Sequence, residues 1–181
     1  MRRIAHTFAT VMGMTLAVVT PAMSSSSHDS GSVGAGTHVV LTLKGRGVDG
    51  DTAGTFTLKA ANGVASDAGP MRVGANISSP PPQPVPGYLG WQGTAVGHAE
   101  LRGKQGAIWL SLSESFISVK ASTVYTVVST GTWRIRRGTG IYESWSGSGP
   151  FVSADRHAPS PKNRPSDARP YEARLVGLVT H

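Results

Sequence analysis

Few residues of this chain have the types and spacing that chemistry requires, and most of them are aromatic or acidic. The ligand-binding candidates are Trp91, Trp109, Trp133 and Trp145, together with Tyr142 and Glu143, because aromatic side chains around a pocket can hold an apolar or sugar-like molecule. Glu143 follows a glycine-rich turn and Glu172 lies in the last apolar stretch. Either glutamate would serve as a general acid or base if it were buried in a pocket. Core packing for the aromatic residues and surface exposure for the glutamates are the competing interpretations.

Histidine and carboxylate residues form two weak metal patterns. His98 and Glu100 are two residues apart on one expected strand, so they share a face, and His38 could join them. Asp49 and Asp51 flank a glycine, but a calcium loop needs more oxygen ligands in register. Neither pattern repeats a known ligand spacing. We therefore predict surface residues and a turn at these places, with no metal site and no cofactor.

Other catalytic motifs are missing from the sequence. The chain has no Cys, which excludes thiolate chemistry and disulfides. Gly147-Ser148-Gly149 lacks the form of a nucleophile elbow. No helix is expected after Gly138-Thr139-Gly140, so backbone amides that could bind phosphate are not predicted there. The sequence therefore favours a protein that is not an enzyme.

Short β-strands are the elements that must position these residues. Apolar and polar residues alternate in short stretches separated by Gly, Asn and Asp, a pattern typical of strands and turns. The expected strands are 37–44, 55–60, 69–75, 93–101, 107–112, 116–120, 124–136 with a bulge at 130–131, 147–153 and 171–179. Glycine, at 23 of 181 residues, fits bulges and corners in a strongly curved sheet. We predict an all-β fold, an antiparallel barrel of about eight strands, with a β-sandwich as the alternative.

The segment 131–151 indicates the architecture most clearly. It begins as a strand that carries Trp133 on its apolar face and then enters the turn Gly138-Thr139-Gly140. Tyr142 and Trp145 follow this turn at a spacing that allows both to pack behind it. We predict a tight β-ribbon with a corner packed by aromatic residues.

The chain divides into three parts. Residues 1–22 combine two arginines, an apolar run and small residues, the pattern of a secretory signal peptide. The run is too short for a comfortable membrane span of about 20 residues. Residues 23–36 form a flexible Ser/Gly-rich tether, and 37–181 form one barrel domain. Within that domain, 78–90 and 153–170 are expected to be Pro-rich loops, the second of them basic. We expect an exported, secreted protein that does not span the membrane once the signal is cleaved.

The net charge of +7 bears on the partners of the protein. Basic charge attracts nucleic acids, anionic polymers and membrane surfaces. No nucleic-acid-binding motif accompanies it, so specific nucleic-acid binding is not expected. An anionic cell-wall polymer is the macromolecular partner that the charge favours.

The sequence also resembles a known superfamily. The run Gly138-Thr139-Gly140-Ile141-Tyr142, followed by Gly147-Ser148-Gly149 and Phe151, is similar to the corner of the allene oxide cyclase and dirigent barrels. The similarity is greatest to their small exported bacterial relatives, which share a closing strand like 173–179. The resemblance implies an eight-stranded barrel with a partly apolar interior. The matched residues are turn and packing residues, and the acidic residues of the plant members have no counterparts here.

Three functions are consistent with these observations. The first is an exported, non-enzymatic barrel that binds a small apolar ligand or a cell-surface polymer. The second is an isomerase or cyclase of the allene oxide cyclase type, which requires a carboxylate that points into a cavity. The third is a structural envelope protein that attaches through the basic loop at 153–170.

Overall fold

The structure is a computed structural model that describes residues 36–48, 51–63, 65–78, 81–121, 124–157 and 168–181. It contains nine strands, β1 (Thr37–Val48), β2 (Asp51–Ala60), β3 (Ser66–Ile77), β4 (Gln83–Pro84), β5 (Gly90–Arg102), β6 (Ala107–Ala121), β7 (Val124–Gly138), β8 (Ser146–His157) and β9 (Arg169–Thr180). Two single 3-10 turns, η1 (Ala61–Gly63) and η2 (Gly140–Tyr142), complete it. The predicted signal peptide and residues 23–35 of the predicted tether lie outside the described residues. No helix in the described part of the chain is long and apolar enough to span a bilayer.

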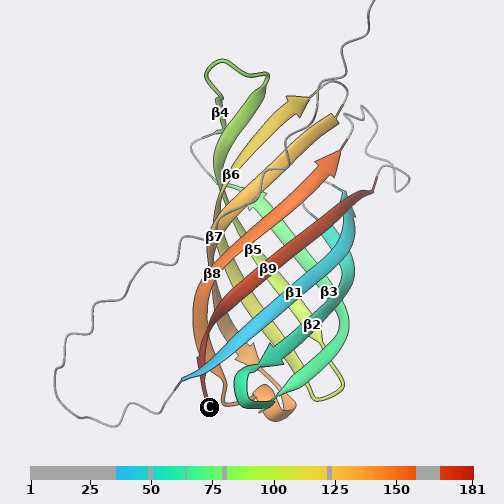
Figure 1. The fold of residues 1–181 in the computed structure, drawn as a ribbon, viewed down its shortest axis with the longest axis vertical. Helices are drawn as coiled ribbons and strands as arrows, with labels where there is room; N and C mark the ends of the chain where they lie inside the picture. The colour runs from blue at the N-terminus through green and yellow to red at the C-terminus, as the bar shows by residue number, and fades with distance from the viewer. Residues whose placement is uncertain (1–35, 49–50, 64, 79–80, 122–123, 158–167) are drawn as a thin grey trace, which may run out of the picture. The chain divides into compact units, whose positions relative to one another are not determined.

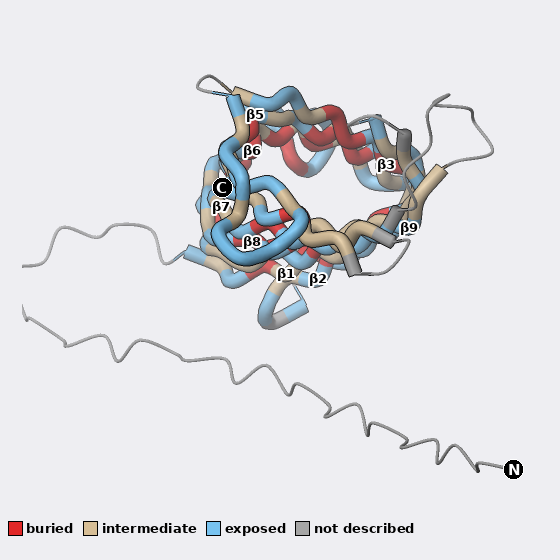
Figure 2. Tube along the Cα trace, turned by 90° about the horizontal axis from the view of Figure 1, so that it is seen from above, coloured by how far each residue is buried: buried red, intermediate tan, exposed pale blue. Residues whose placement is uncertain are grey.

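The strands form one closed antiparallel barrel. Neighbours follow the order β3-β2-β1-β9-β8-β7-β6-β5-β4, and an additional pairing of β3 with β5 closes the ring. Eight strands therefore make the wall, and β4 is an extra edge strand on β5 (Figure 1). Figure 2 looks down this ring from above. The predicted all-β fold and eight-stranded barrel are confirmed.

Alternation along the strands fills one end of the barrel with apolar side chains. On β1, Val39, Leu41 and Leu43 are buried, while the residues between them are at least partly exposed. This follows from the two-residue period of a strand, which sends successive side chains to opposite faces. The largest buried side chains are Trp133 and Tyr142, and they lie at the end of the barrel where β7 leads into η2. We call this the closed end.

A buried carboxylate links three segments of the chain at the closed end. Asp67, 7% exposed, accepts hydrogen bonds from the backbone N–H groups of Ala68 (2.8 Å), Lys104 (3.0 Å) and Gln105 (3.1 Å). The Tyr142 hydroxyl donates a fourth, at 2.9 Å. Burial opposes ionisation of Asp67, but these hydrogen bonds outweigh it and lower its pKa. The carboxylate thus joins β3, the β5–β6 turn and η2, and accounts for the predicted aromatic corner.

Strand β6 differs from the prediction of two strands. It runs unbroken from Ala107 to Ala121 and pairs with β5 and β7 along this length. The expected bulge at 130–131 is also wrong, because pairing there is regular. The register shifts instead where Trp109 pairs with Arg137 and the next residue, Leu110, pairs with Ile135. Arg136 is the extra residue of that bulge.

Both Pro-rich segments contain more strand than predicted. Within 78–90, Gln83 and Pro84 pair with β5. A proline is tolerated here because β4 is an edge strand, where a missing N–H leaves no partner unsatisfied. The predicted loop 153–170 is shorter than expected, because β8 continues to His157 and β9 begins at Arg169. The residues between, 158–167, lie outside the described part.

Candidate ligand-binding cavity

The end of the barrel opposite η2 encloses a cavity of about 680 Å³, and we call this the open end. Small side chains contribute to the space, because several inward positions carry Gly, Ala, Ser or Thr here, although larger residues such as Phe116 and Tyr171 also line it. The small lining residues are Gly47, Thr52, Ala75, Ala95, Ser118, Ser129 and Ser153. An eight-stranded barrel is just wide enough for side chains to fill, so its volume depends on these small residues.

The cavity lining combines apolar residues with a group of ionisable residues. The apolar residues come from four strands: Val73 and Ile77 of β3, Trp91 of β5, Leu112 and Phe116 of β6, and Val127 of β7. The ionisable residues come from β6, β8 and β9, the last two lying across the ring from β5 (Figure 2). They are Glu114, Asp155, Arg169 and Tyr171. A molecule in the cavity would therefore meet both hydrocarbon and ionisable groups, and Glu114 lies between Leu112 and Phe116 on β6.

Glu114 is the ionisable group of β6. It continues the inward face that Leu110 and Leu112 begin, and it lies half-buried in the cavity wall. Burial in this low-dielectric surrounding raises the pKa of Glu114, and a hydrogen bond from the Ser129 hydroxyl opposes the rise only in part. The carboxyl therefore holds its proton more tightly than an exposed glutamate.

Asp155 and Arg169 are the charged groups of β8 and β9 at the cavity. Burial raises the pKa of Asp155, while the nearby positive charge of Arg169 and the backbone N–H of Arg156 act in the opposite direction. The Nε atom of Arg169 is buried and has no hydrogen-bond partner among the described residues. Arg169 thus places a positive charge and a donor at the cavity wall.

Tyr171 lies within electrostatic reach of both acids. Burial raises the pKa of its hydroxyl, and the charges of Glu114 and Asp155 raise it further. A hydrogen bond from Ser153 acts in the opposite direction. Tyr171 is therefore a neutral phenol at physiological pH. Groups with perturbed pKa values in a cavity can donate hydrogen bonds to a ligand or transfer protons to and from it.

Of the residues predicted as ligand-binding from the sequence, Trp91 lines the cavity, Trp133 is buried in the core, and the other four also lie away from the cavity. Trp109 is on the outer surface, where the guanidinium carbon of Arg137 lies 3.9 Å from its ring centroid. Trp145 is buried at the closed end against Tyr142, with ring centroids 4.9 Å apart. Glu143 is exposed beside η2. None of these four residues lines the cavity.

The other candidate acids and histidines are on the outer face of the barrel. Glu172 is exposed and forms an ion pair with Lys44 at 3.1 Å, so neither it nor Glu143 meets the condition of burial that an acid–base role requires. Glu100 is paired with Arg102, and His98 is exposed. No group of three or more metal-ligating side chains occurs within the described ranges.

Sequence reasoning missed Glu114, Asp155, Arg169 and Tyr171 as a group. One signal could have found the first of them, because Glu114 is four residues beyond Leu110 and an unbroken strand sends both side chains inward. Asp155 and Arg169 lie in the segment predicted as a loop, so no inward position was assigned to them.

Comparison with known proteins identifies no relative, because the chain matches no protein-family model, no curated protein and no solved structure.

Proposed function

We propose that this protein is an exported barrel that binds a small, largely apolar molecule in the cavity at its open end. The observation that carries the proposal is a cavity of about 680 Å³ whose lining combines apolar residues with four ionisable residues. Ligand pockets are typically about 300–1,000 Å³ and combine apolar walls with a few polar groups. The ligand that fits this description has an apolar body and a polar group.

A pair of substitutions on β5 tests the proposal. Ala95 is 5% exposed and lines the cavity, whereas its neighbour Val96 is 55% exposed on the outer face. Ala95→Trp should fill part of the cavity and weaken ligand binding by about ten-fold or more, while Val96→Trp should leave it unchanged. Native mass spectrometry with farnesol, dodecanoic acid and geranylamine provides the measurement, because these probes share an apolar body and differ in the head group.

The result that contradicts binding is equally specific. If no probe binds the wild-type protein, or if both tryptophan variants bind as the wild type does, the cavity is not a ligand site for this class. A thermal unfolding curve of each variant shows that any loss of binding occurs in folded protein.

Acid–base catalysis in the same cavity is the second candidate function. It is the isomerase or cyclase that the resemblance to allene oxide cyclases implies, and it is supported by Glu114 beside Tyr171 in an apolar surrounding. A glutamate with a raised pKa is suited to proton transfer near neutral pH. In this role the Glu114 carboxylate would remove a proton from carbon next to a carbonyl, and Tyr171 would donate a hydrogen bond to the oxygen.

Deuterium exchange separates catalysis from binding. The wild-type protein in D2O should exchange the enolisable hydrogens of carvone, a small terpenoid ketone, faster than buffer alone. Glu114→Gln should abolish the exchange and still bind carvone, because the amide cannot accept the proton. Exchange at the buffer rate, or equal exchange by both proteins, would leave binding as the function.

A further inference from the structure

The hairpin of β4 and β5 carries a rigid tip beyond the wall of the barrel. Val85 accepts a hydrogen bond from the backbone N–H of Tyr88 at 3.2 Å, and Gly87 between them has a φ of 76°. With Pro86 before this glycine, the four residues have the form of a type II turn. At the base of the tip, the backbone N–H of Lys120 donates to the Leu89 carbonyl at 2.7 Å. The tip is therefore fixed both internally and to β6.

This rigid tip presents apolar side chains to solvent. Tyr88 is 69% exposed, Leu89 is 74% exposed and Trp91 is 51% exposed. Leaving such side chains in water forgoes the favourable free energy that burying them would contribute. Contiguous exposed apolar residues on a soluble domain mark interaction sites. The tip consequently has the properties of a docking element.

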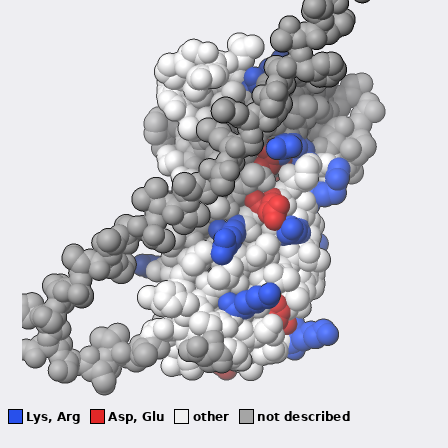
Figure 3. Space-filling view, viewed as in Figure 1, with Lys and Arg blue, Asp and Glu red and all other residues white. Residues whose placement is uncertain are grey.

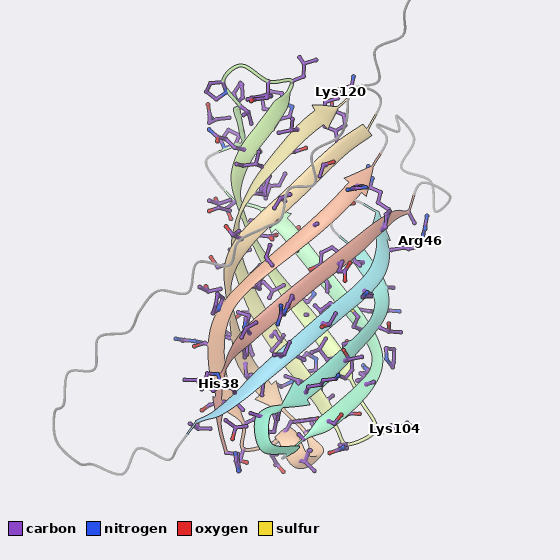
Figure 4. All side chains as sticks on the ribbon, viewed as in Figure 1. His38, Arg46, Lys104 and Lys120 are labelled. Carbon is purple, nitrogen blue, oxygen red and sulfur yellow. The ribbon has the colours of Figure 1, made fainter. Side chains whose placement is uncertain are left out.

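The tip is also the rim of the cavity. Trp91 and Ile77 both line the cavity, and Ile77 is 63% exposed. In Figure 4 the hairpin projects at the same end of the barrel as Lys120, while Arg46 lies lower, on the right of the view. A surface in contact with the tip would therefore lie close to the mouth through which an apolar molecule enters.

The charge of the outer surface identifies the partner. Eleven Lys and Arg residues of the described chain are exposed, against three acidic residues, Asp51, Glu143 and Glu172. Figure 3 shows this excess on one face. Arg46 and Arg156 belong to it at the open end, where Lys120 lies next to the tip. An exposed Trp, Tyr and Leu beside Lys120, with Arg46 and Arg156 farther round the same rim, is a combination suited to the interface of an anionic bilayer.

We propose that the β4–β5 tip docks the barrel onto an anionic lipid membrane, with the cavity mouth facing the lipid. The docking proposal depends only on the exposed tip and on the surface charge. The consequence that the ligand enters from the membrane rests on the proposed function. Tyr88 and Leu89 would insert at the depth of the headgroups, and Trp91 would bridge the bilayer interface and the cavity.

Vesicle binding tests the docking. The full chain is mixed with vesicles of phosphatidylcholine, or with vesicles in which about a third of the lipid is phosphatidylglycerol, and bound protein is measured by sedimentation. We expect the anionic vesicles to bind more protein, by about five-fold for each Lys or Arg that reaches the surface. Tyr88→Ser with Leu89→Ser should weaken binding about ten-fold or more. Ile141→Ser with Leu178→Ser is the matched control, because both residues are about half exposed at the closed end, at 47% and 48%.

Tryptophan quenching locates the contact within the molecule. The four tryptophans begin at Trp91, so the first 35 residues contribute no signal. Brominated lipid should quench Trp91, and Trp91→Phe should remove the quenching. Absence of vesicle binding, or equal binding by the tip variant, would overturn the proposal. Tip-dependent dimers in solution without vesicle binding would overturn it in favour of a second copy of the chain. Probe binding in free solution, compared between Ala95→Trp and the wild type, reports on the cavity independently.

Discussion

Removing the Tyr142 hydroxyl should destabilise the barrel through the loss of one hydrogen bond. In Tyr142→Phe the ring still packs against Trp145, while Asp67 loses the donor at 2.9 Å and keeps its three backbone donors. A hydrogen bond to a charged group contributes about 1.5–3 kcal/mol. For a domain of this size each kcal/mol shifts the melting temperature by about 2–4 °C. We therefore expect the melting temperature to fall by about 3–12 °C.

Asp67→Asn should cost more than Tyr142→Phe. Oδ1 of Asp67 accepts from Ala68 and Lys104, and Oδ2 accepts from Gln105 and Tyr142. If the NH2 group takes the place of Oδ2, the Tyr142 hydroxyl can turn to accept from it, so only the hydrogen bond from Gln105 is lost, while the bonds that remain lose the charge of their acceptor. The expected cost therefore exceeds about 1.5–3 kcal/mol, the contribution of one hydrogen bond to a charged group. The two substitutions share a contact, so their effects on the free energy of unfolding should not add.

The pH dependence gives an independent check of the charge on Asp67. Its pKa in the folded protein is below the ordinary value of 3.8, so its ionised form contributes stability above pH 3.8. That contribution is lost as the pH falls through the lower, folded pKa. The difference in unfolding free energy between the wild type and Asp67→Asn should therefore shrink in strong acid.

Urea unfolding followed by circular dichroism, from neutral to acidic pH, measures these differences. Tyr88→Phe is the control, because it removes the hydroxyl of a tyrosine that is 69% exposed. The reasoning is refuted if Tyr142→Phe is as stable as this control, or if Asp67→Asn is no less stable than Tyr142→Phe.

Two further substitutions test the open end and the corner. Because the pKa of Glu114 is raised, ionising it costs stability above its ordinary value of 4.5, so Glu114→Gln should be more stable than the wild type at neutral pH and equal to it in acid, as urea titrations can show. An equal or lower stability at neutral pH would contradict burial of that carboxyl. Gly140→Ala should lower the free energy of unfolding by about 1–3 kcal/mol, because Gly140 has a φ of 62° and an added Cβ would lie close to the Gln105 carbonyl oxygen. Gly63→Ala is its control, since Gly63 has a φ of 70° and open space around it, so a smaller loss is expected there.

The sequence predicted the closed end well because hydrophobic alternation is unbroken there. At the closed end of β1 and β2, alternate residues are apolar and buried: Val39, Leu41 and Leu43 on β1, and Phe56 and Leu58 on β2. The glycine-rich turn and the aromatic residues after it likewise identified the corner. What the pattern did not reveal was Asp67, because a buried acid in a strand looks like a surface residue until its donors are known.

The cavity could not be predicted for the opposite reason. Its inward positions carry Ser118, Glu114 and Asp155, while outward positions of the same strands carry Ile117 and Val152, so the alternation of apolar inward and polar outward residues disappears. That loss of pattern divided β6 into two predicted strands and turned the end of β8 into a predicted loop. The polar inward residues that obscured the strand pattern are therefore the same residues that line the cavity.

The pKa of the acidic residue is shifted in opposite directions at the two ends of the barrel. This difference indicates that the open end is a ligand site and not a packing defect. Asp67 receives four donors and its pKa falls, whereas Glu114 has a hydrogen bond from Ser129 and its pKa rises. A ligand that brings a hydrogen-bond donor or a positive charge to Glu114 would stabilise its ionised carboxylate, which the surrounding residues do only in part. Geranylamine should therefore raise the melting temperature of the wild type more than that of Glu114→Gln, and farnesol should show a smaller difference between the two proteins. Equal shifts would mean that the carboxyl does not contact the ligand, and that the apolar residues of the cavity alone account for binding.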